Sequence, residues 1–310
     1  MNILVTGASG LAGSAIVECF KKYGFNVMGI GRKDLNLLNR DETFDYIIRR
    51  SPNLIVNAAA KVGGILANND HPVEYLAENL RMQNNLIEAA HFADVEKFIF
   101  LGSSCIYPRD CEQPIKEEFL LSGPLEPTNS AYAIAKIAGI ELINSFRRQY
   151  GRKWVSIMPT NLYGPRDNFN LQGSHVLPAF IRRFVEAKQK NAQSETLWGT
   201  GTPTREFLHV DDLAEAVVFF HDKYDSGTHL NIGTGREISI MELASIVAKF
   251  AGFAGEIRWD PSKPNGTPRK VLDSTLANNL GWSSRISLED GIESTVKWYE
   301  KELAVGRVRL

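Results

Sequence analysis

Cysteine is scarce in this sequence, and the three that occur do not form a pattern. Cys19, Cys105 and Cys111 are odd in number and lack the spacing of metal ligands, and the six histidines are scattered. The sequence therefore excludes a disulfide framework and gives no support to a metal site. Free cysteines of this kind predict a reducing, cytoplasmic setting.

Long apolar runs and surplus charge are also missing. No apolar stretch approaches the ~18 residues that a membrane span requires. The first predicted strand begins almost at Met1, so we expect no signal peptide. The formal net charge of −1 gives no bulk electrostatic case for binding nucleic acid or an anionic membrane. With 310 residues, the chain is long enough for about two lobes.

What is present begins with a glycine-rich turn between a predicted strand and a predicted helix. Residues 2–6 form a short apolar run, the glycines Gly7, Gly10 and Gly13 follow, and residues 14–20 have helical character. In such a turn the glycines allow a tight bend, close approach of a pyrophosphate and close packing of helix on strand. The helix N-terminus then offers free N–H groups to phosphates. An ordinary glycine turn is the competing interpretation.

The end of the second predicted strand, residues 26–31, bears on the choice of cofactor. Arg32 and Lys33 follow it directly. An arginine here suits the extra phosphate of NADP, whereas an acidic residue would select NAD. We predict that Arg32 binds NADP, with a solvated surface pair as the alternative, and Asp34 nearby leaves the choice open.

Tyr132 and Lys136 are four residues apart and therefore share one face of a predicted helix. An ammonium near a phenol favours the phenolate, so we expect Lys136 to lower the pKa of Tyr132. A tyrosine of this kind can exchange a proton with an oxygen at neutral pH. An ordinary core tyrosine and a solvated lysine would have the same spacing.

The order of the elements predicts an α/β fold with a Rossmann-type, doubly wound parallel sheet and a smaller α/β C-terminal substrate lobe. Further strands are expected at residues 54–60, 98–102 and 155–158, and helices at 73–92, 141–150, 176–187 and 239–250. Residues 159–165 are predicted to form a rigid, turn-rich segment directly after the strand at 155–158. We expect an NADP-binding domain at 1–163 with a later contribution from about 205–235, and a substrate-binding lobe at 164–204 and 236–310.

Six stretches resemble the extended short-chain dehydrogenases/reductases that act on nucleotide sugars, in particular those that epimerise and reduce a GDP-sugar. They are residues 58–64, 101–108, 131–139, 158–165, 205–212 and 263–270. The resemblance covers essentially the whole chain. It implies NADPH-dependent conversion of GDP-4-keto-6-deoxy-D-mannose to GDP-L-fucose, by epimerisation at C3 and C5 and hydride reduction at C4. It also implies a homodimer.

The resemblance extends to individual residues. It implies Ser103, Tyr132 and Lys136 as the reductase triad and Cys105 and His175 as the epimerising pair. The expected NADP(H) contacts are Gly7, Ser9, Gly10, Gly13, Arg32, Leu101, Gly102, Lys136, Pro159, Asn161 and Leu162. The expected substrate contacts are Asn161, Arg183, Trp198, Arg205 and Lys270. Two departures stand out: Ser9 replaces a basic residue that relatives can carry, and Asn265 stands where an aspartate is familiar.

The chemistry gives these residue types a reason. Inverting a carbon beside a ketone needs a base and an acid on opposite faces, and donors for the enolate oxygen. A thiolate at Cys105 and the imidazole of His175 suit the first task, and Tyr132 with Ser103 the second. Each has a plainer interpretation: a buried small side chain for Cys105, a solvated loop residue for His175. Arg183 and Arg205 could be surface charges, Trp198 lobe packing, and His209 a helix cap.

Two other functions fit parts of the pattern. A redox-neutral nucleotide-sugar 4-epimerase or 4,6-dehydratase would retain NAD. A dehydratase is expected to carry Asp-Glu after the strand-four serine, where Ser104 and Cys105 stand, and a 4-epimerase needs no thiol–imidazole pair. A non-catalytic NADP-sensing protein would not need Tyr132 and Lys136.

Overall fold

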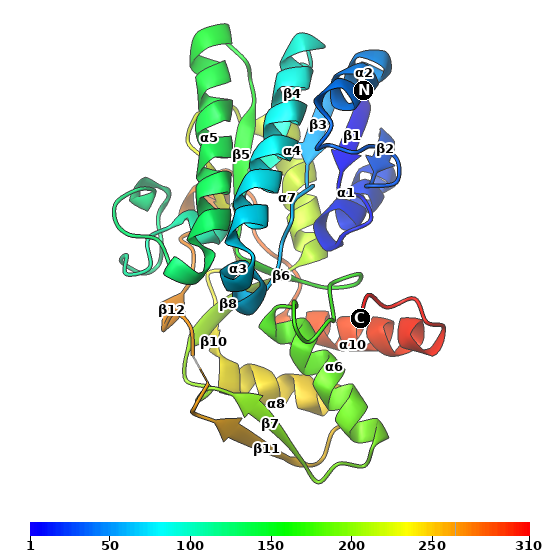
Figure 1. The fold of residues 1–310 in the computed structure, drawn as a ribbon, viewed down its shortest axis with the longest axis vertical. Helices are drawn as coiled ribbons and strands as arrows, with labels where there is room; N and C mark the ends of the chain where they lie inside the picture. The colour runs from blue at the N-terminus through cyan, green and yellow to red at the C-terminus, as the bar shows by residue number, and fades with distance from the viewer. Residues whose placement is uncertain (264) are drawn as a thin grey trace.

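The computed structural model describes residues 1–263 and 265–310, so Pro264, within the 263–270 stretch, lies outside the described residues. Its larger lobe is built on a sheet of six parallel strands in the order β2-β1-β3-β4-β5-β9 (Figure 1). The strands are β1 (Asn2–Thr6), β2 (Asn26–Ile30), β3 (Leu54–Asn57), β4 (Lys97–Leu101), β5 (Val155–Pro159) and β9 (Leu230–Ile232). The strand order reverses beside β1, and ligands of doubly wound folds bind at the carboxyl edge there. The predicted Rossmann-type sheet is confirmed.

Helices cover both faces of this sheet, as apolar strands require. One apolar cluster joins the sheet to α1 (Leu11–Lys22) and α7 (Val210–Lys223). A second joins it to α2 (Arg40–Arg50), α4 (Pro72–Phe92) and α5 (Ser130–Tyr150). The short α3 (Ile65–Asp70) precedes α4. The helix α5 packs unusually close to β4, because a Cβ on Gly139 would lie 2.3 Å from the Phe100 ring.

The smaller lobe has its own apolar core, formed by α6 (Val176–Gln189), α8 (Ile240–Ala251) and α10 (Leu288–Ala304). The parallel pair β7 (Ser194–Trp198) and β11 (Glu256–Asp260) lies at its outer edge (Figure 1). The helix α8 begins at a capping box in which Ser239 and Glu242 satisfy each other's backbone N–H groups. The predicted helices at 176–187 and 239–250 are confirmed within two residues.

A third sheet lies between the lobes. Its central strand β8 (Thr204–His209) pairs with β6 (Asn161–Tyr163), β10 (Glu237–Ser239) and the two-residue β12 (Arg269–Lys270). The expectation of a turn-rich segment over 159–165 is therefore wrong, because residues 161–163 pair with β8 along their length. Turn-forming residues in sequence do not report a strand that is formed by a distant partner.

The C-terminal segment crosses between the lobes. Leu272 packs in the apolar cluster that joins the large sheet to α2, α4 and α5. Ala277 of α9 (Thr275–Asn279) and Trp282 pack in the cluster that joins the sheet to α1 and α7. Residues 272–282 therefore belong with the larger lobe, in contrast to the expected substrate-lobe segment 236–310. Among the described residues, no helix is long and apolar enough to cross a bilayer.

Candidate active site

The glycine-rich turn forms the bend that its sequence predicts. Gly7 has a φ of 69°, and a Cβ there would lie 2.7 Å from the carbonyl oxygen of Ala58. A Cβ on Gly13 would lie 2.3 Å from the Gly7 carbonyl oxygen, so only glycine allows α1 to sit this close to β1. The cap residue Gly10 makes no side-chain bond to the first N–H groups of α1. Those donors and the positive end of the helix face the sheet edge where a pyrophosphate is expected.

The end of β2 places a carboxylate as well as a guanidinium near this turn. Arg32 is exposed, and Asp34 folds back so that its Oδ2 accepts the Gly31 N–H at 2.8 Å. A Cβ on Gly31 would lie 3.2 Å from Ser9 Oγ and 3.8 Å from Asp34 Oδ2. Ser9 and Asp34 therefore lie together at the edge where an adenosine ribose is expected. Only Arg32 and Lys33 supply positive charge in this turn.

Tyr132 and Lys136 lie on the buried face of α5, with exposed fractions of 5% and 3%. The Lys136 Nζ donates to the carbonyl oxygen of Leu101, the last residue of β4, at 2.8 Å. It also lies 4.8 Å from the centre of the Phe100 ring and 5.8 Å from that of Tyr132. The structure thus joins the α5 pair to the end of β4, where Gly102 and Ser103 follow.

The expected lowering of the Tyr132 pKa is wrong. Burial, reinforced by nearby Cys105, raises the pKa of Tyr132, and the Ser103 hydroxyl opposes this only in part. Burial also lowers the pKa of Lys136 to about 8. The physical reason is desolvation: both side chains are in the core, where each charged form loses water. The phenol therefore keeps its proton more firmly than an exposed tyrosine does.

Cys105 begins the second half of the site. It lies in a short 3₁₀ turn, Ser104–Ile106, whose preceding residue Ser103 accepts the Cys105 N–H through its side chain at 3.3 Å. The Cys105 Sγ has two polar neighbours: Lys270 Nζ at 3.8 Å and Asn129 Nδ2 at 3.5 Å. A pocket opens beside these groups, and its further polar lining includes Arg109, Gln113, Glu126, Thr267 and Arg269. The thiol is therefore half-buried and lines this pocket.

His175 and Arg205 complete this group through charge. His175 is the N-cap residue of α6, makes no side-chain cap bond and keeps part of its surface exposed to solvent. Desolvation by the surrounding atoms, and then the charge of Lys270, lower the pKa of His175. Burial lowers the pKa of Arg205, and Cys105 and Glu126 oppose that shift. Lys270 and Arg205 are register partners on β12 and β8, and Lys270 is the one whose ammonium contacts the thiol.

Other expected site residues lie around this centre. Pro159 ends β5, and Asn161 and Leu162 belong to β6, with Asn161 Nδ2 donating to the Glu206 carbonyl oxygen at 2.8 Å. Arg183 of α6 forms an ion pair with Glu195 at 2.6 Å. Trp198 at the end of β7 is 50% exposed, and the Lys263 Nζ lies 5.7 Å from the centre of its ring. Within the described residues no hydrogen bond or ion pair joins Arg183 or Trp198 to the Cys105 group.

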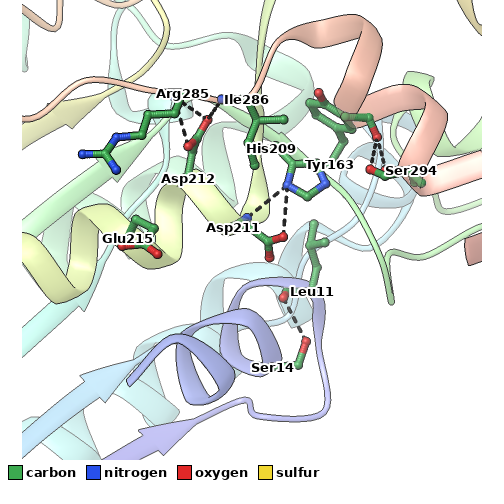
Figure 2. Close-up of polar contacts among 12 residues, drawn as sticks. Leu11, Ser14, Tyr163, His209, Asp211, Asp212, Glu215, Arg285, Ile286 and Ser294 are labelled. Atoms are coloured by element: carbon green, nitrogen blue, oxygen red, sulfur yellow. Dashed lines mark hydrogen bonds and ion pairs between the residues drawn. The ribbon is translucent and has the colours of Figure 1, made fainter. Parts of the chain in front are cut away.

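His209 is a structural residue, as predicted. Its Nδ1 accepts the Asp211 N–H at 3.3 Å and so caps α7 (Figure 2). The neighbouring Asp212 accepts the N–H groups of Arg285 and Ile286 at 3.0–3.1 Å. These bonds fix the segment that leads into α10.

Sequence reasoning missed Asn129 and Glu206. Asn129 precedes α5, where an asparagine normally caps the helix, yet its side chain makes no cap bond and faces the Cys105 sulfur. The position of Asn129 before a helical run is visible in the sequence, but it predicts a helix cap and not a contact with Cys105. Glu206 carried no signal of its own, because its partners come from segments about 30 and 70 residues away.

Fold and site define a Rossmann-type short-chain dehydrogenase/reductase with a tyrosine–lysine pair beside a thiol. The chain belongs to the NAD-dependent epimerase/dehydratase family, whose pattern matches residues 3–233. It is 49% identical to "GDP-L-fucose synthase 1" of Arabidopsis thaliana, over 97% of this chain and 94% of that protein. It is 48% identical to "GDP-L-fucose synthase" of Escherichia coli, over 96% of each. The NADP-bound GDP-L-fucose synthetase structure from Naegleria fowleri superposes with a TM-score of 0.91 at 30% identity, over 100% and 95% of the chains.

Proposed function

We propose that this chain is an NADP-dependent epimerase–reductase that converts GDP-4-keto-6-deoxy-D-mannose to GDP-L-fucose. Epimerisation at C3 and C5 precedes reduction of the C4 ketone. The observation that carries this proposal is the Cys105 thiol beside the Ser103–Tyr132 pair, in a chain nearly half identical to proteins named for this activity. A simple reductase would need the phenol and hydroxyl but not the thiol.

Cys105 and His175 are the proposed base and acid of the epimerisation. The thiolate takes a proton from the carbon beside the ketone, and the imidazolium returns one to the opposite face. Lys270 supports the assignment of Cys105, because its ammonium is 3.8 Å from the sulfur and favours the thiolate. The same charge lowers the pKa of His175, so an imidazolium there is the more ready to give up its proton. A cation beside the thiol also attracts the enolate that forms while the proton is absent.

Ser103 and Tyr132 are the proposed donors to the keto oxygen. The raised pKa of Tyr132 supports this assignment, because a phenol that keeps its proton can donate to the enolate and later protonate the C4 alkoxide. One oxygen site then supports both half-reactions. Lys136 is fixed by its bond to the Leu101 carbonyl oxygen, next to this site.

The residues present fit NADP(H). Gly7 and Gly13 shape a cradle that any Cβ would fill, and the first turn of α1 has free N–H groups for a pyrophosphate. We assign Gly7, Ser9, Gly10 and Gly13 to the phosphates and adjacent ribose, and Arg32 to the extra phosphate. We assign Leu101, Gly102, Lys136, Pro159, Asn161 and Leu162 to the nicotinamide half. When bound, NADPH supplies the hydride for C4.

On the substrate side, we assign Asn161, Arg183, Trp198, Arg205 and Lys270 to the GDP-sugar. Two arginines and a lysine match the charge of a diphosphate, and Arg205 and Lys270 are the pair nearest the thiol. The smaller lobe would then hold the nucleotide, and the larger lobe the cofactor. A homodimer and a cytoplasmic location remain predictions, and light scattering of the purified protein tests the first.

The decisive experiment incubates the purified protein with GDP-4-keto-6-deoxy-D-mannose and NADPH and identifies the product by NMR. We expect loss of NADPH absorbance and formation of GDP-L-fucose. No absorbance loss at any protein concentration would reject the proposal. Deuterium entry from heavy water without NADPH separates epimerisation from reduction. A retained-NAD epimerase or dehydratase would transform its substrate without net NADPH consumption, and an NADP sensor would bind the cofactor and do neither.

A further inference from the structure

Glu206 on β8 is a fully buried carboxylate whose hydrogen bonds come from backbone amides and threonine hydroxyls. Its exposed fraction is 0%, and no ion pair reaches it within the described part of the chain. Oε1 accepts the Gly235 N–H at 2.7 Å and the Thr234 hydroxyl at 3.4 Å, and Oε2 accepts the Leu272 N–H at 2.9 Å. Burial raises the pKa of Glu206, and these bonds oppose that shift. A buried carboxylate without a cation is costly, so its role depends on what it holds.

What it holds is the segment that carries Lys270. The strand β12 has only two residues, and its pairing with β8 is too short to fix a side chain alone. Leu272, two residues beyond Lys270, is tied to β8 by the Glu206 carboxylate. Ile115 also holds this segment: its N–H donates to the Val271 carbonyl oxygen, and its carbonyl oxygen accepts the Asp273 N–H, both at 2.8 Å. Lys270 therefore directly precedes a doubly anchored segment, with its Nζ 3.8 Å from the Cys105 Sγ.

We propose that Glu206 is a positioning residue for the Cys105–Lys270 pair. Its carboxylate holds β12 against β8 through the Leu272 amide, and this sets the ammonium of Lys270 at the thiol. Glu206 touches neither substrate nor cofactor in this scheme and acts only through Lys270. The inference rests on the proposed function, because deuterium entry into the keto sugar is its readout.

The first test compares two carboxylates that both contact the β12 segment. Glu206→Gln replaces one acceptor oxygen by an NH₂ group, which then faces the N–H of Leu272 or of Gly235. Arg269 donates two bonds of 2.8 Å to the Glu237 carboxylate on β10. Glu237→Gln weakens these bonds, but they are exposed, so water can replace them. We expect deuterium entry to fall about tenfold or more with Glu206→Gln and less than about twofold with Glu237→Gln. The Kd for NADPH should be unchanged in both.

The second test asks whether Glu206 acts through Lys270. In the Lys270→Ala background, Glu206→Gln should cause no further loss of deuterium entry, because the group that it positions is already gone. Independent, multiplying losses would overturn the proposal. A purely structural residue would give another result: Glu206→Gln would melt at a lower temperature but show normal deuterium entry in assays well below that temperature. This result would also overturn the proposal. A crystal structure of Glu206→Gln should show Lys270 Nζ displaced from Cys105 Sγ, and an unchanged distance would also overturn it.

Two further results keep the outcomes distinct. If Glu206→Gln does not fold, Glu206→Asp replaces it, because a carboxylate one methylene shorter cannot reach both Leu272 and Gly235. Full deuterium entry in folded Glu206→Asp would then count against the proposal. If the unsubstituted protein itself shows no deuterium entry, the proposed function fails. If the unsubstituted protein shows normal deuterium entry but the losses in Glu206→Gln and Lys270→Ala multiply, only the inference about Glu206 fails.

Discussion

The two halves of the candidate site are built in different ways. The carbonyl half, Ser103, Tyr132 and Lys136, comes from the end of β4 and the first turns of α5, and core residues cover it. The thiol half joins Cys105 to Lys270, 165 positions away, and to the exposed His175 at the start of α6. The first half is held within the larger lobe by the packing of α5 on the end of β4, whereas the second depends on how the lobes and the C-terminal segment dock. Substitutions should therefore separate the two half-reactions.

The largest expected effect separates the thiol half from cofactor binding. Cys105→Ser replaces the thiol by a much less acidic hydroxyl, so deuterium entry into the keto sugar should fall by about 10²–10⁴-fold. The Kd for NADPH, measured by fluorescence titration, should not change. Equal deuterium entry in variant and parent would remove Cys105 from the mechanism.

The opposite separation is expected at Lys136. Lys136→Met keeps the volume of the buried side chain but removes the ammonium that donates to the Leu101 carbonyl oxygen. NADPH oxidation should fall about 100-fold, because the charged donor beside the carbonyl site is lost. Deuterium entry should fall less, by about tenfold, because the same oxygen site holds the enolate but the thiol half stays intact. Lys153→Met, at an exposed position, is the control. Parallel loss of both activities would show that the halves are not separable.

A smaller effect is expected at the far end of the proposed cofactor site. Arg32→Ala should raise the Kd for NADPH about tenfold, because a charge-assisted bond to the extra phosphate is lost. The Kd for NADH, which lacks that phosphate, should change less than about twofold. Lys33→Ala provides the matched control on the neighbouring exposed cation. An unchanged ratio of the two Kd values would assign no selectivity to Arg32.

The smallest effect concerns the loop that leads to His175. Burial raises the pKa of Asp167 from 3.8 to about 7, and its Oδ1 accepts the Asn168 N–H at 2.7 Å. The folded state therefore binds this proton more tightly than the unfolded state does. The contribution of Asp167 to the free energy of unfolding falls as pH rises from 3.8 through about 7, and is lowest above that.

Asp167→Asn keeps the acceptor but cannot ionise. Its melting temperature should exceed that of the parent by a few degrees near about pH 8, and the difference should shrink toward about pH 5. Calorimetry at both pH values measures this, with the exposed Asp110→Asn as control. A difference that is independent of pH would mean that Asp167 does not titrate in this range.

Much of the carbonyl half could be predicted from sequence because its determinants are local. The spacing of Tyr132 and Lys136 fixes a shared helix face, and Gly7 and Gly13 fix a bend between strand and helix. The pKa of Tyr132 could not be predicted in the same way. Spacing reports that an ammonium is near, but not that both groups are buried, and burial outweighs the neighbour's charge.

The sequence alone determined the strand–turn–helix order, the face of α5 that carries Tyr132 and Lys136, and the cap that His209 forms, because each depends on residues a few positions apart. The tertiary structure decided that residues 161–163 form a strand, that Lys270 lies at the Cys105 sulfur, and that Glu206 anchors the segment between them. These features join residues tens to more than a hundred positions apart. No periodicity or local propensity encodes such pairings, since they arise only when the lobes and the C-terminal segment pack together.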